Sequence, residues 1–200
     1  MPAILFYGDS NTYGYDPADL ADNRYPEEER WTSILQRLLS DNWHVISQGM
    51  NGRRIPDIFR DGERLERLLR TLSDNDIFAV MLGTNDILLT MQPDASVAIR
   101  KMEEFIRFLN RHLRPDQILV IAPPLIGRED IKDAFYQTCF RESRKMNDGF
   151  RLLADQYGTR FADASGWGVE LSFDLVHFSK EGHLRFAEEM SELLFKINDD

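Results

Sequence analysis

At residues 77–82 the chain reads Ile-Phe-Ala-Val-Met-Leu, a continuous apolar run. A strand buried on both faces has this pattern, and such strands are typical of parallel sheets covered by helices. Comparable runs occur at 3–7, 118–122 and 160–162, and a weaker one at 43–47. The run at 118–122 is followed by Pro123 and Pro124, which cannot continue a central strand. These runs predict five strands.

Helical periodicity separates the strand-like runs. Leu65, Leu68, Leu69 and Leu72, for example, follow the spacing that places apolar residues on one helical face. The pattern predicts helices over the ranges 31–39, 58–72, 97–113, about 140–157 and 180–197. Strands that alternate with helices indicate an α/β fold with a parallel sheet, helices on both faces and right-handed crossovers. We expect residues 1–200 to form a single domain, because no repeat or linker divides them.

Two longer irregular stretches, 11–30 and 123 to about 138, follow predicted strands. Strand ends and the loops after them are where open α/β sheets bind their ligands. We therefore expect both stretches to lie on the active face as substrate-binding loops.

Composition excludes several classes of function. The net charge of −10 argues against a nucleic-acid partner, because such surfaces gather Lys and Arg. No basic segment leads an apolar stretch at the start of the chain, and no run approaches the ~18 apolar residues of a membrane span, so we expect a cytoplasmic protein without a membrane partner. The one cysteine, Cys139, cannot form an internal disulfide, which agrees with a reducing compartment.

The sequence also argues against bound cofactors. Dinucleotide and phosphate sites use glycine-rich loops, either Gly-x-Gly-x-x-Gly or a loop that ends in Lys-Ser/Thr, and the chain contains neither. The four histidines are scattered and no His-Glu-x-x-His segment is present, so no metal is expected.

Four short polar segments carry groups suited to acyl transfer. They read Gly-Asp-Ser-Asn at 8–11, Gly-Met-Asn-Gly-Arg at 49–53, Gly-Thr-Asn-Asp at 83–86 and Asp-Leu-Val-His at 174–177. Each has an ordinary explanation on its own: a helix cap for the first, turns for the next two, and a loop histidine for the last. The chemical interpretation depends on finding all four in one chain.

Each segment supplies a different part of that chemistry. Ser10 follows a predicted strand, and a serine hydroxyl needs a base to become a nucleophile. Asp174 stands three residues before His177, so its carboxylate can hold one ring nitrogen and leave the other as the base. The amide of Asn85 is a neutral donor for a developing oxyanion. His183 competes with His177, but Lys180, three residues before it, cannot accept an imidazole N–H.

In order and content these segments resemble the four blocks of the SGNH hydrolases, the GDSL esterase family, over residues 8–177. The resemblance implies a flavodoxin-like three-layer sandwich with a five-stranded parallel sheet. It implies that Ser10 is the nucleophile, His177 the general base and later the acid, and Asp174 the carboxylate that orients it. Asn11 stands where the family usually has leucine.

The same resemblance implies an oxyanion hole. Its donors would be the backbone N–H groups of Ser10 and Gly52 and the side-chain amide of Asn85. Gly49 lies close to Gly52 in the sequence and stays open as the alternative glycine.

Residues 8–15 and 49–53 look most like the arylesterase and acyltransferase members, several of which are homo-oligomers. The implied function is a serine esterase that hydrolyses short-chain acyl esters, acetyl-like or aryl, through an acyl-enzyme and without a cofactor. Its partner would be a small-molecule ester. The alternatives are a carbohydrate O-deacetylase on the same machinery and a non-catalytic flavodoxin-like binding module. Candidate substrate-binding residues are Asp9, Tyr13, Leu88, Leu89 and Trp167.

Overall fold

The computed structural model describes residues 1–19, 21 and 23–199. In that part of the chain, five strands form one parallel sheet in the order β2-β1-β3-β4-β5, which is the flavodoxin-like order. The strands are β1 (Ala3–Gly8), β2 (His44–Gly49), β3 (Ile77–Met81), β4 (Ile118–Ala122) and β5 (Arg160–Asp163). The predicted α/β fold with a five-stranded parallel sheet is confirmed, and each strand lies within two residues of its predicted bounds.

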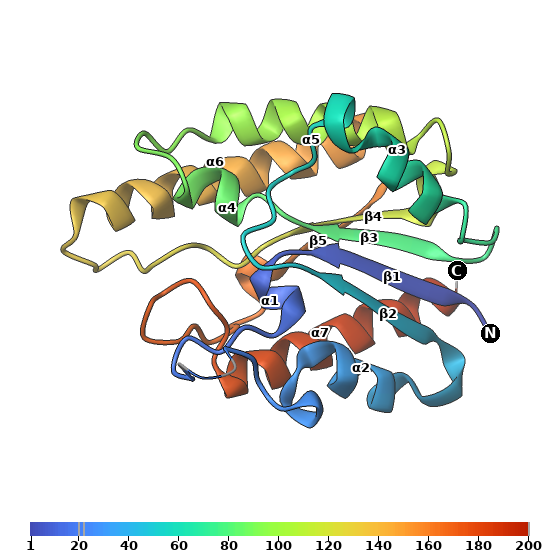
Figure 1. The fold of residues 1–200 in the computed structure, drawn as a ribbon, viewed down its shortest axis with the longest axis horizontal. Coiled ribbons are helices and arrows are strands. Elements are labelled where there is room, and N and C mark those ends of the chain that lie inside the picture. The colour runs from blue at the N-terminus through green and yellow to red at the C-terminus, as the bar shows by residue number, and fades with distance from the viewer. Residues whose placement is uncertain (20, 22, 200) are drawn as a thin grey trace.

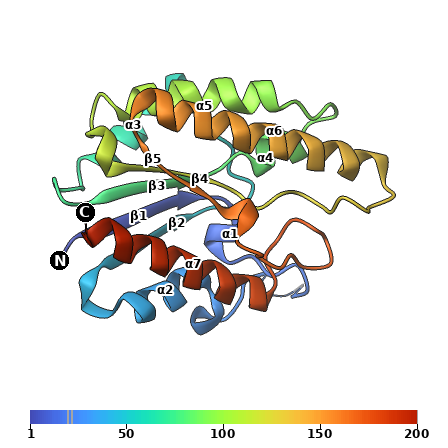
Figure 2. The same ribbon diagram turned by 180° about the vertical axis from the view of Figure 1, so that it is seen from behind.

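Helices cover both faces of the sheet and make the three-layer sandwich (Figures 1 and 2). One face carries α3 (Ile58–Leu69), α5 (Ala95–Leu109) and α6 (Ala134–Tyr157), and the other carries α2 (Trp31–Leu39) and α7 (Lys180–Asp199). Shorter elements are α1 (Ser10–Tyr13), α4 (Thr84–Leu88) and the 3₁₀ helices η1 (Glu27–Glu29), η2 (Ser40–Asn42), η3 (Pro115–Gln117) and η4 (Ala164–Gly166).

The continuous apolar run of β3 serves two cores. Phe78 and Val80 pack in the cluster under α5 and α6, whereas Ala79 and Met81 pack in the cluster under α2 and α7. Successive side chains of a strand point to opposite faces, so a strand between two helical layers must be apolar at every position. The burial of all five β3 residues follows from this placement.

Several predicted helix bounds need correction. Helix α6 begins at Ala134 instead of about 140, because the Asp133 side chain accepts the backbone N–H groups of Phe135 and Tyr136 and caps the helix there. The irregular stretch after β4 is therefore shorter than predicted. Helices α3 and α5 end before residues 72 and 113, since their last turns tighten, as in the bond from the Leu72 N–H to the Leu69 carbonyl.

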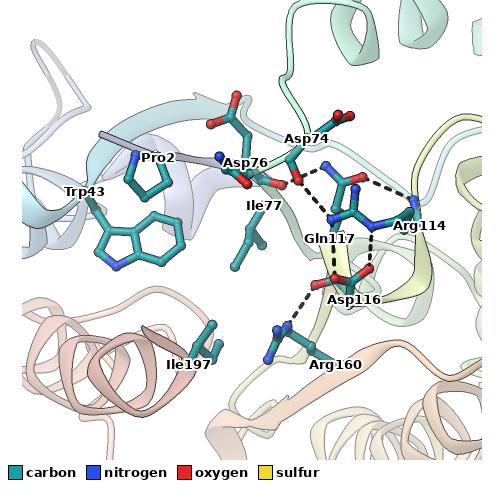
Figure 3. A pocket seen from close by; sticks show the side chains of 11 residues that line it. Pro2, Trp43, Asp74, Asp76, Ile77, Arg114, Asp116, Gln117, Arg160 and Ile197 are labelled. Carbon is teal, nitrogen blue, oxygen red and sulfur yellow. Dashed lines mark hydrogen bonds and ion pairs between the residues drawn. The ribbon is translucent and has the colours of Figure 1, made fainter. Parts of the chain in front are cut away.

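The two edges of the sheet differ in what they hold. All strands are parallel, so their carboxyl ends share one edge, where α1 and α4 begin, and both chain termini lie at the opposite edge (Figure 1). A cavity of about 330 Å³ lies at this amino edge (Figure 3). There Asp76 accepts the Ala3 N–H at 2.6 Å, and the Gln117 amide donates to the carbonyls of Ser73 and Asp76. None of the described helices combines the length and apolar composition needed to cross a membrane.

Candidate active site

Ser10 is the first residue of α1, directly beyond the carboxyl end of β1. The Asp9 side chain caps this short helix by accepting the Asn11 N–H at 3.0 Å. An aspartate at this position satisfies a backbone donor that has no partner inside the helix. The chain therefore turns immediately after the strand, and Ser10 is held at the edge where the sheet's reactive groups are expected.

The histidine lies in a tight loop before α7. Leu171 and Phe178 form an antiparallel bridge, and the Ser172 N–H donates to the His177 carbonyl at 2.6 Å. Leu175 has a φ of 59°, a left-handed conformation that costs a residue with a side chain about 1–2 kcal/mol. The contacts that close this loop hold Leu175 in that conformation.

The structure brings together three of the predicted side chains. Ser10 Oγ lies 2.9 Å from His177 Nε2, although 167 residues separate them in sequence. His177 Nδ1 lies 2.6 Å from Asp174 Oδ2. The other oxygen of Asp174 accepts the backbone N–H groups of Val176 and His177, at 3.1 and 3.0 Å. The spacing of three residues thus folds into one turn, as predicted.

Hydrogen bonds control the charge of Asp174. Burial acts to raise the pKa of this carboxyl, but the His177 ring and the two backbone N–H groups together hold its pKa below the ordinary value. Asp174 is therefore ionised at neutral pH. A fixed carboxylate on Nδ1 orients the imidazole and stabilises the imidazolium that forms when Nε2 takes a proton.

Asn85 and Gly52 lie on neighbouring segments at the same edge. The Asn85 side chain donates to the Arg53 carbonyl at 3.1 Å, which joins α4 to the segment after β2. Asp86 strengthens this junction, since its buried carboxylate accepts the Ile55 N–H and the Lys101 ammonium, both at 2.8 Å. The segment that contains Gly52 is therefore fixed by the residues that follow β3.

The two candidate glycines have different surroundings. A Cβ on Gly49 would lie 2.1 Å from the Tyr13 backbone nitrogen, so Gly49 allows β2 to approach α1 closely. Gly52 has a φ of +71°, and a Cβ there would meet nothing within 4 Å. Gly49 is explained by packing, whereas Gly52 stands in an open turn with a left-handed backbone.

Arg53 holds the turn at Gly52 in place through its buried side chain. Its side chain is buried, donates to the Gly8 carbonyl at 2.8 Å and to the Gln48 carbonyl, and stacks 4.0 Å from the centre of the Tyr7 ring. These contacts join the ends of β1 and β2. In the sequence, this arginine is distinguished only as the residue after Gly52.

Asp9 is the buried carboxyl closest in sequence to the serine. Burial raises its pKa to about 6, against the opposing effects of the Asn11 N–H, the neighbouring His177 and the Arg53 guanidinium. Asp9 was predicted to bind substrate, and the structure places its side chain inside the turn, where it caps α1.

The other predicted substrate-binding residues have different surroundings. The Tyr13 ring lies under the Arg24 guanidinium at 4.0 Å, and the Trp167 ring packs against Phe186 of α7. Leu88 is half-buried against the core under α5, and Leu89 is exposed. Contact of these residues with a substrate stays a prediction.

Tyr15 was missed by the sequence analysis. Its ring centre lies 4.5 Å from that of His177, at an angle of 48°. Tyr15 belongs to the stretch 11–30 that we expected to face the substrate, but no pattern in the sequence distinguishes it from the other tyrosines there. It forms the wall of the site beside the imidazole.

A cavity of about 480 Å³ opens beside Gly52, between the segment after β2, α3 and α5. Its lining is mostly charged and includes both signs. The residues are Tyr7, Met50, Gly52, Arg53, Arg54, Ile55, Pro56, Asp57, Arg60, Asp61, Arg64, Lys101 and Glu104. Such a lining offers many hydrogen-bonding groups to a polar ligand.

His183 is buried in the structural core. Its Nδ1 accepts the Trp31 N–H at 3.3 Å, and burial, with the nearby Arg30 charge, lowers its pKa to about 3. It therefore stays uncharged at neutral pH. The described residues contain no cluster of three or more His, Cys, Asp or Glu side chains placed to hold a metal ion.

Hydrogen bonds link a hydroxyl, an imidazole and a carboxylate in that order at the carboxyl edge of a parallel sheet. This is the arrangement of serine hydrolases, a class that includes carboxylic ester hydrolases. The model of the GDSL-like lipase/acylhydrolase family matches residues 6–185. The chain therefore belongs to this family.

Solved structures agree with this assignment. A carbohydrate acetylesterase family member from Sinorhizobium meliloti is 28% identical, with a TM-score of 0.80 and coverage of 98% of this chain and 99% of that one. Est24, a carbohydrate acetylesterase from the same species, is 22% identical, with a TM-score of 0.81 and coverage of 98% and 100%. The aryl esterase of M. smegmatis is 22% identical, with a TM-score of 0.77 and the same coverage. A search of curated protein sequences gives no match.

Proposed function

We propose that this chain is a serine esterase that hydrolyses short-chain acyl esters, with Ser10 as nucleophile, His177 as general base and Asp174 as its orienting group. The contact of 2.9 Å between Ser10 Oγ and His177 Nε2 carries the proposal. It pairs a weak nucleophile with a base, and the 2.6 Å contact to Asp174 fixes the tautomer of that base.

The reaction has two halves. Ser10 Oγ attacks the ester carbonyl carbon while His177 Nε2 takes the hydroxyl proton, and the carbonyl oxygen becomes an oxyanion. The C–O bond to the alcohol then breaks, the alcohol leaves with the proton from His177, and the acyl group stays on Ser10. A water molecule, deprotonated by the same imidazole, releases the acid and restores the serine.

The proposed oxyanion hole uses the backbone N–H groups of Ser10 and Gly52 and the side chain of Asn85. One amide hydrogen of Asn85 is directed to the Arg53 carbonyl, so the second is free to serve the oxyanion. We choose Gly52 over Gly49 because Gly49 is explained by its close approach to Tyr13, whereas the left-handed turn at Gly52 opens onto a cavity.

Tyr15 supports a compact acyl or aryl substrate, because its ring occupies the space beside His177. The aryl esterase of M. smegmatis shares the fold, which agrees with this choice. A series of p-nitrophenyl esters with increasing chain length tests it. We expect kcat/KM to be highest for the shortest acyl groups, and an optimum at long chains would contradict the proposal.

A carbohydrate O-deacetylase is the second candidate. The 28% identical neighbour is a carbohydrate acetylesterase family member. The charged cavity reaches Gly52, the proposed oxyanion donor, and offers hydrogen-bonding groups to an alcohol rich in hydroxyl groups, but Ser10 and His177 do not line it. Acetylated sugars assayed beside p-nitrophenyl acetate decide between the two candidates. A kcat/KM for the sugar that exceeds the aryl ester's would favour the deacetylase.

Replacement of the nucleophile tests the proposed function itself. We expect Ser10→Ala to lose at least about 10⁴-fold in kcat on p-nitrophenyl acetate, since loss of a catalytic serine has an effect of this order or larger. Ser191→Ala, which changes another buried serine in α7, should keep wild-type activity. Wild-type turnover by Ser10→Ala would remove Ser10 from its role. A wild-type protein that hydrolyses none of the esters would leave the non-catalytic binding module as the better explanation.

The remaining expectations concern the whole protein. We propose that residues 1–200 work as a single domain on a small-molecule ester. The homo-oligomer, the cytoplasmic location, and the lack of a cofactor or nucleic-acid partner stay predictions of the sequence.

A further inference from the structure

We propose that Asn11 is a positioning residue that holds the histidine segment against the helix of the nucleophile. The inference rests on the proposed roles of Ser10 and His177 and adds a residue that acts through them. Asn11 follows Ser10 directly in α1, and its side-chain amide makes hydrogen bonds to the segment before α7.

The Asn11 side chain bonds to the peptide groups on both sides of His177. Its Nδ2 donates to the Val176 carbonyl at 3.2 Å, and its Oδ1 accepts the Phe178 N–H at 2.9 Å. Both contacts are buried, and together they use one donor and the acceptor of a single amide. The backbone of His177 is therefore bracketed by one side chain.

Asn11 is itself fixed at both ends of its backbone. Its N–H donates to Asp9 Oδ1 at 3.0 Å, and its carbonyl accepts the Trp31 indole N–H at 2.9 Å. The residue is 4% exposed. A side chain on so constrained a backbone can set the position of the segment that it binds.

The two contacts of His177 differ in what they need. Asp174 and His177 lie in the same tight loop, so their hydrogen bond moves with the loop. The Ser10–His177 contact joins segments 167 residues apart, so it depends on the position of the loop relative to α1. The side chain of Asn11 holds the loop in position relative to Ser10. A second hydrogen bond, from the Gly127 N–H to the Leu175 carbonyl, also holds the loop.

A small misplacement of the imidazole is enough to slow the reaction. Proton transfer from Ser10 requires hydrogen-bond geometry, and an error of about 1 Å in such a contact can cost about 10²-fold in rate. A leucine at position 11 has a similar size but neither donor nor acceptor in its side chain. This chain therefore depends on an amide that a leucine cannot replace.

Asn11→Leu tests the inference. We expect kcat on p-nitrophenyl acetate to fall about 10- to 100-fold, with KM within about twofold of wild type, because geometry in the transition state is lost and not binding. The low-field proton resonance of the His177 Nδ1–H should persist, since the Asp174 contact lies within the loop. The side chain in Asn11→Ser is too short to bond to both peptide groups, so this variant should also lose kcat while KM stays nearly unchanged. It serves as the test if Asn11→Leu fails to fold.

Gln117→Leu is the matched control. It removes three hydrogen bonds between a buried side-chain amide and backbone, but at the opposite edge (Figure 3). Two are donated to the carbonyls of Ser73 and Asp76, and one is accepted from the Arg114 N–H. We expect it to lower the unfolding midpoint while kcat stays at the wild-type value. An equal kcat loss in both variants would show that Asn11 acts only through stability.

The outcomes separate this inference from the proposed function. Wild-type kcat in folded Asn11→Leu, or a rise in KM alone, overturns the positioning role while Ser10→Ala remains inactive. Full activity in Ser10→Ala overturns the proposed function instead.

Discussion

Two buried aspartates lie at opposite edges of the same sheet, and their pKa values are shifted in opposite directions. Asp76, just before β3 at the amino edge, accepts the backbone N–H groups of Ala3 and Ser73 and the Ser73 hydroxyl. Burial acts to raise its pKa, but these hydrogen bonds hold the pKa below the ordinary value. Asp9, just after β1 at the carboxyl edge, is capped by the Asn11 N–H, and burial raises its pKa to about 6.

The difference separates a structural edge from a functional one. At the amino edge the Asp76 carboxylate accepts hydrogen bonds that favour its charged form, and it stabilises the fold. At the carboxyl edge the polar groups of Ser10 and His177 are directed at each other, and Asp9 bears a cost of burial beside them. Local arrangements that oppose stability are expected where a protein performs chemistry.

After the loss of Ser10 itself, the largest effect is expected at the orienting carboxylate. Asp174→Asn should lower kcat by about 10⁴-fold, because an amide stabilises the wrong tautomer of His177. Asp116→Asn, at the amino edge, should leave kcat unchanged. Initial rates on p-nitrophenyl acetate measure both. A loss below about tenfold for Asp174→Asn would mean that this carboxylate does not orient the base.

The next effect concerns the oxyanion. Asn85→Ala should lower kcat by about 10²–10³-fold, since the oxyanion loses a donor. KM should change little, because the donor acts in the transition state. Steady-state kinetics separate the two constants, and a variant with altered KM but normal kcat would exclude Asn85 from the oxyanion hole.

Asp9→Asn should make the protein more stable at high pH. The folded carboxyl keeps its proton up to about pH 6, whereas the unfolded one loses it near 3.8, so wild-type stability falls as the pH rises between these values. The variant does not titrate there and should gain roughly 3 kcal/mol at pH 8 and almost nothing at pH 4. Urea unfolding at both pH values measures the gain, and an equal change at pH 4 would contradict the assigned pKa.

Asp76→Asn should change the free energy of unfolding in the opposite direction, and by a smaller amount. Because the folded pKa is lowered, the carboxylate stabilises the fold above its unfolded pKa and stops doing so as the pH falls below about 3.8. The variant should lose about 1.5–3 kcal/mol at pH 7, the usual contribution of hydrogen bonds to a charged group. Urea unfolding should show this loss shrinking in acid, and a constant difference would refute the charge-based explanation.

The sequence predicted the features that local patterns carry. Apolar runs located the strands, and the spacing of Asp174 and His177 predicted their contact, which lies within one turn. Residues that act across long separations were not predictable. The bonds of Asn11 span 165 and 167 residues, and no periodicity in the chain records them.

Local competition explains the other differences. The cap at Asp133 starts α6 earlier than its apolar pattern does, because a carboxylate that accepts two backbone N–H groups fixes a helix start whatever follows it. Leu175 adopts a positive φ that its residue type disfavours, and only the closed loop around it explains that conformation.

Covalent labelling tests the central claim, the activation of Ser10 by His177, most directly. A p-nitrophenyl alkylphosphonate reacts with an activated serine by forming an Oγ–P bond and releasing p-nitrophenolate. We predict one equivalent of p-nitrophenolate, a mass increase on the peptide that contains Ser10, and no reaction in Ser10→Ala. An adduct on another residue, or no adduct in a protein that hydrolyses p-nitrophenyl acetate, would contradict the account.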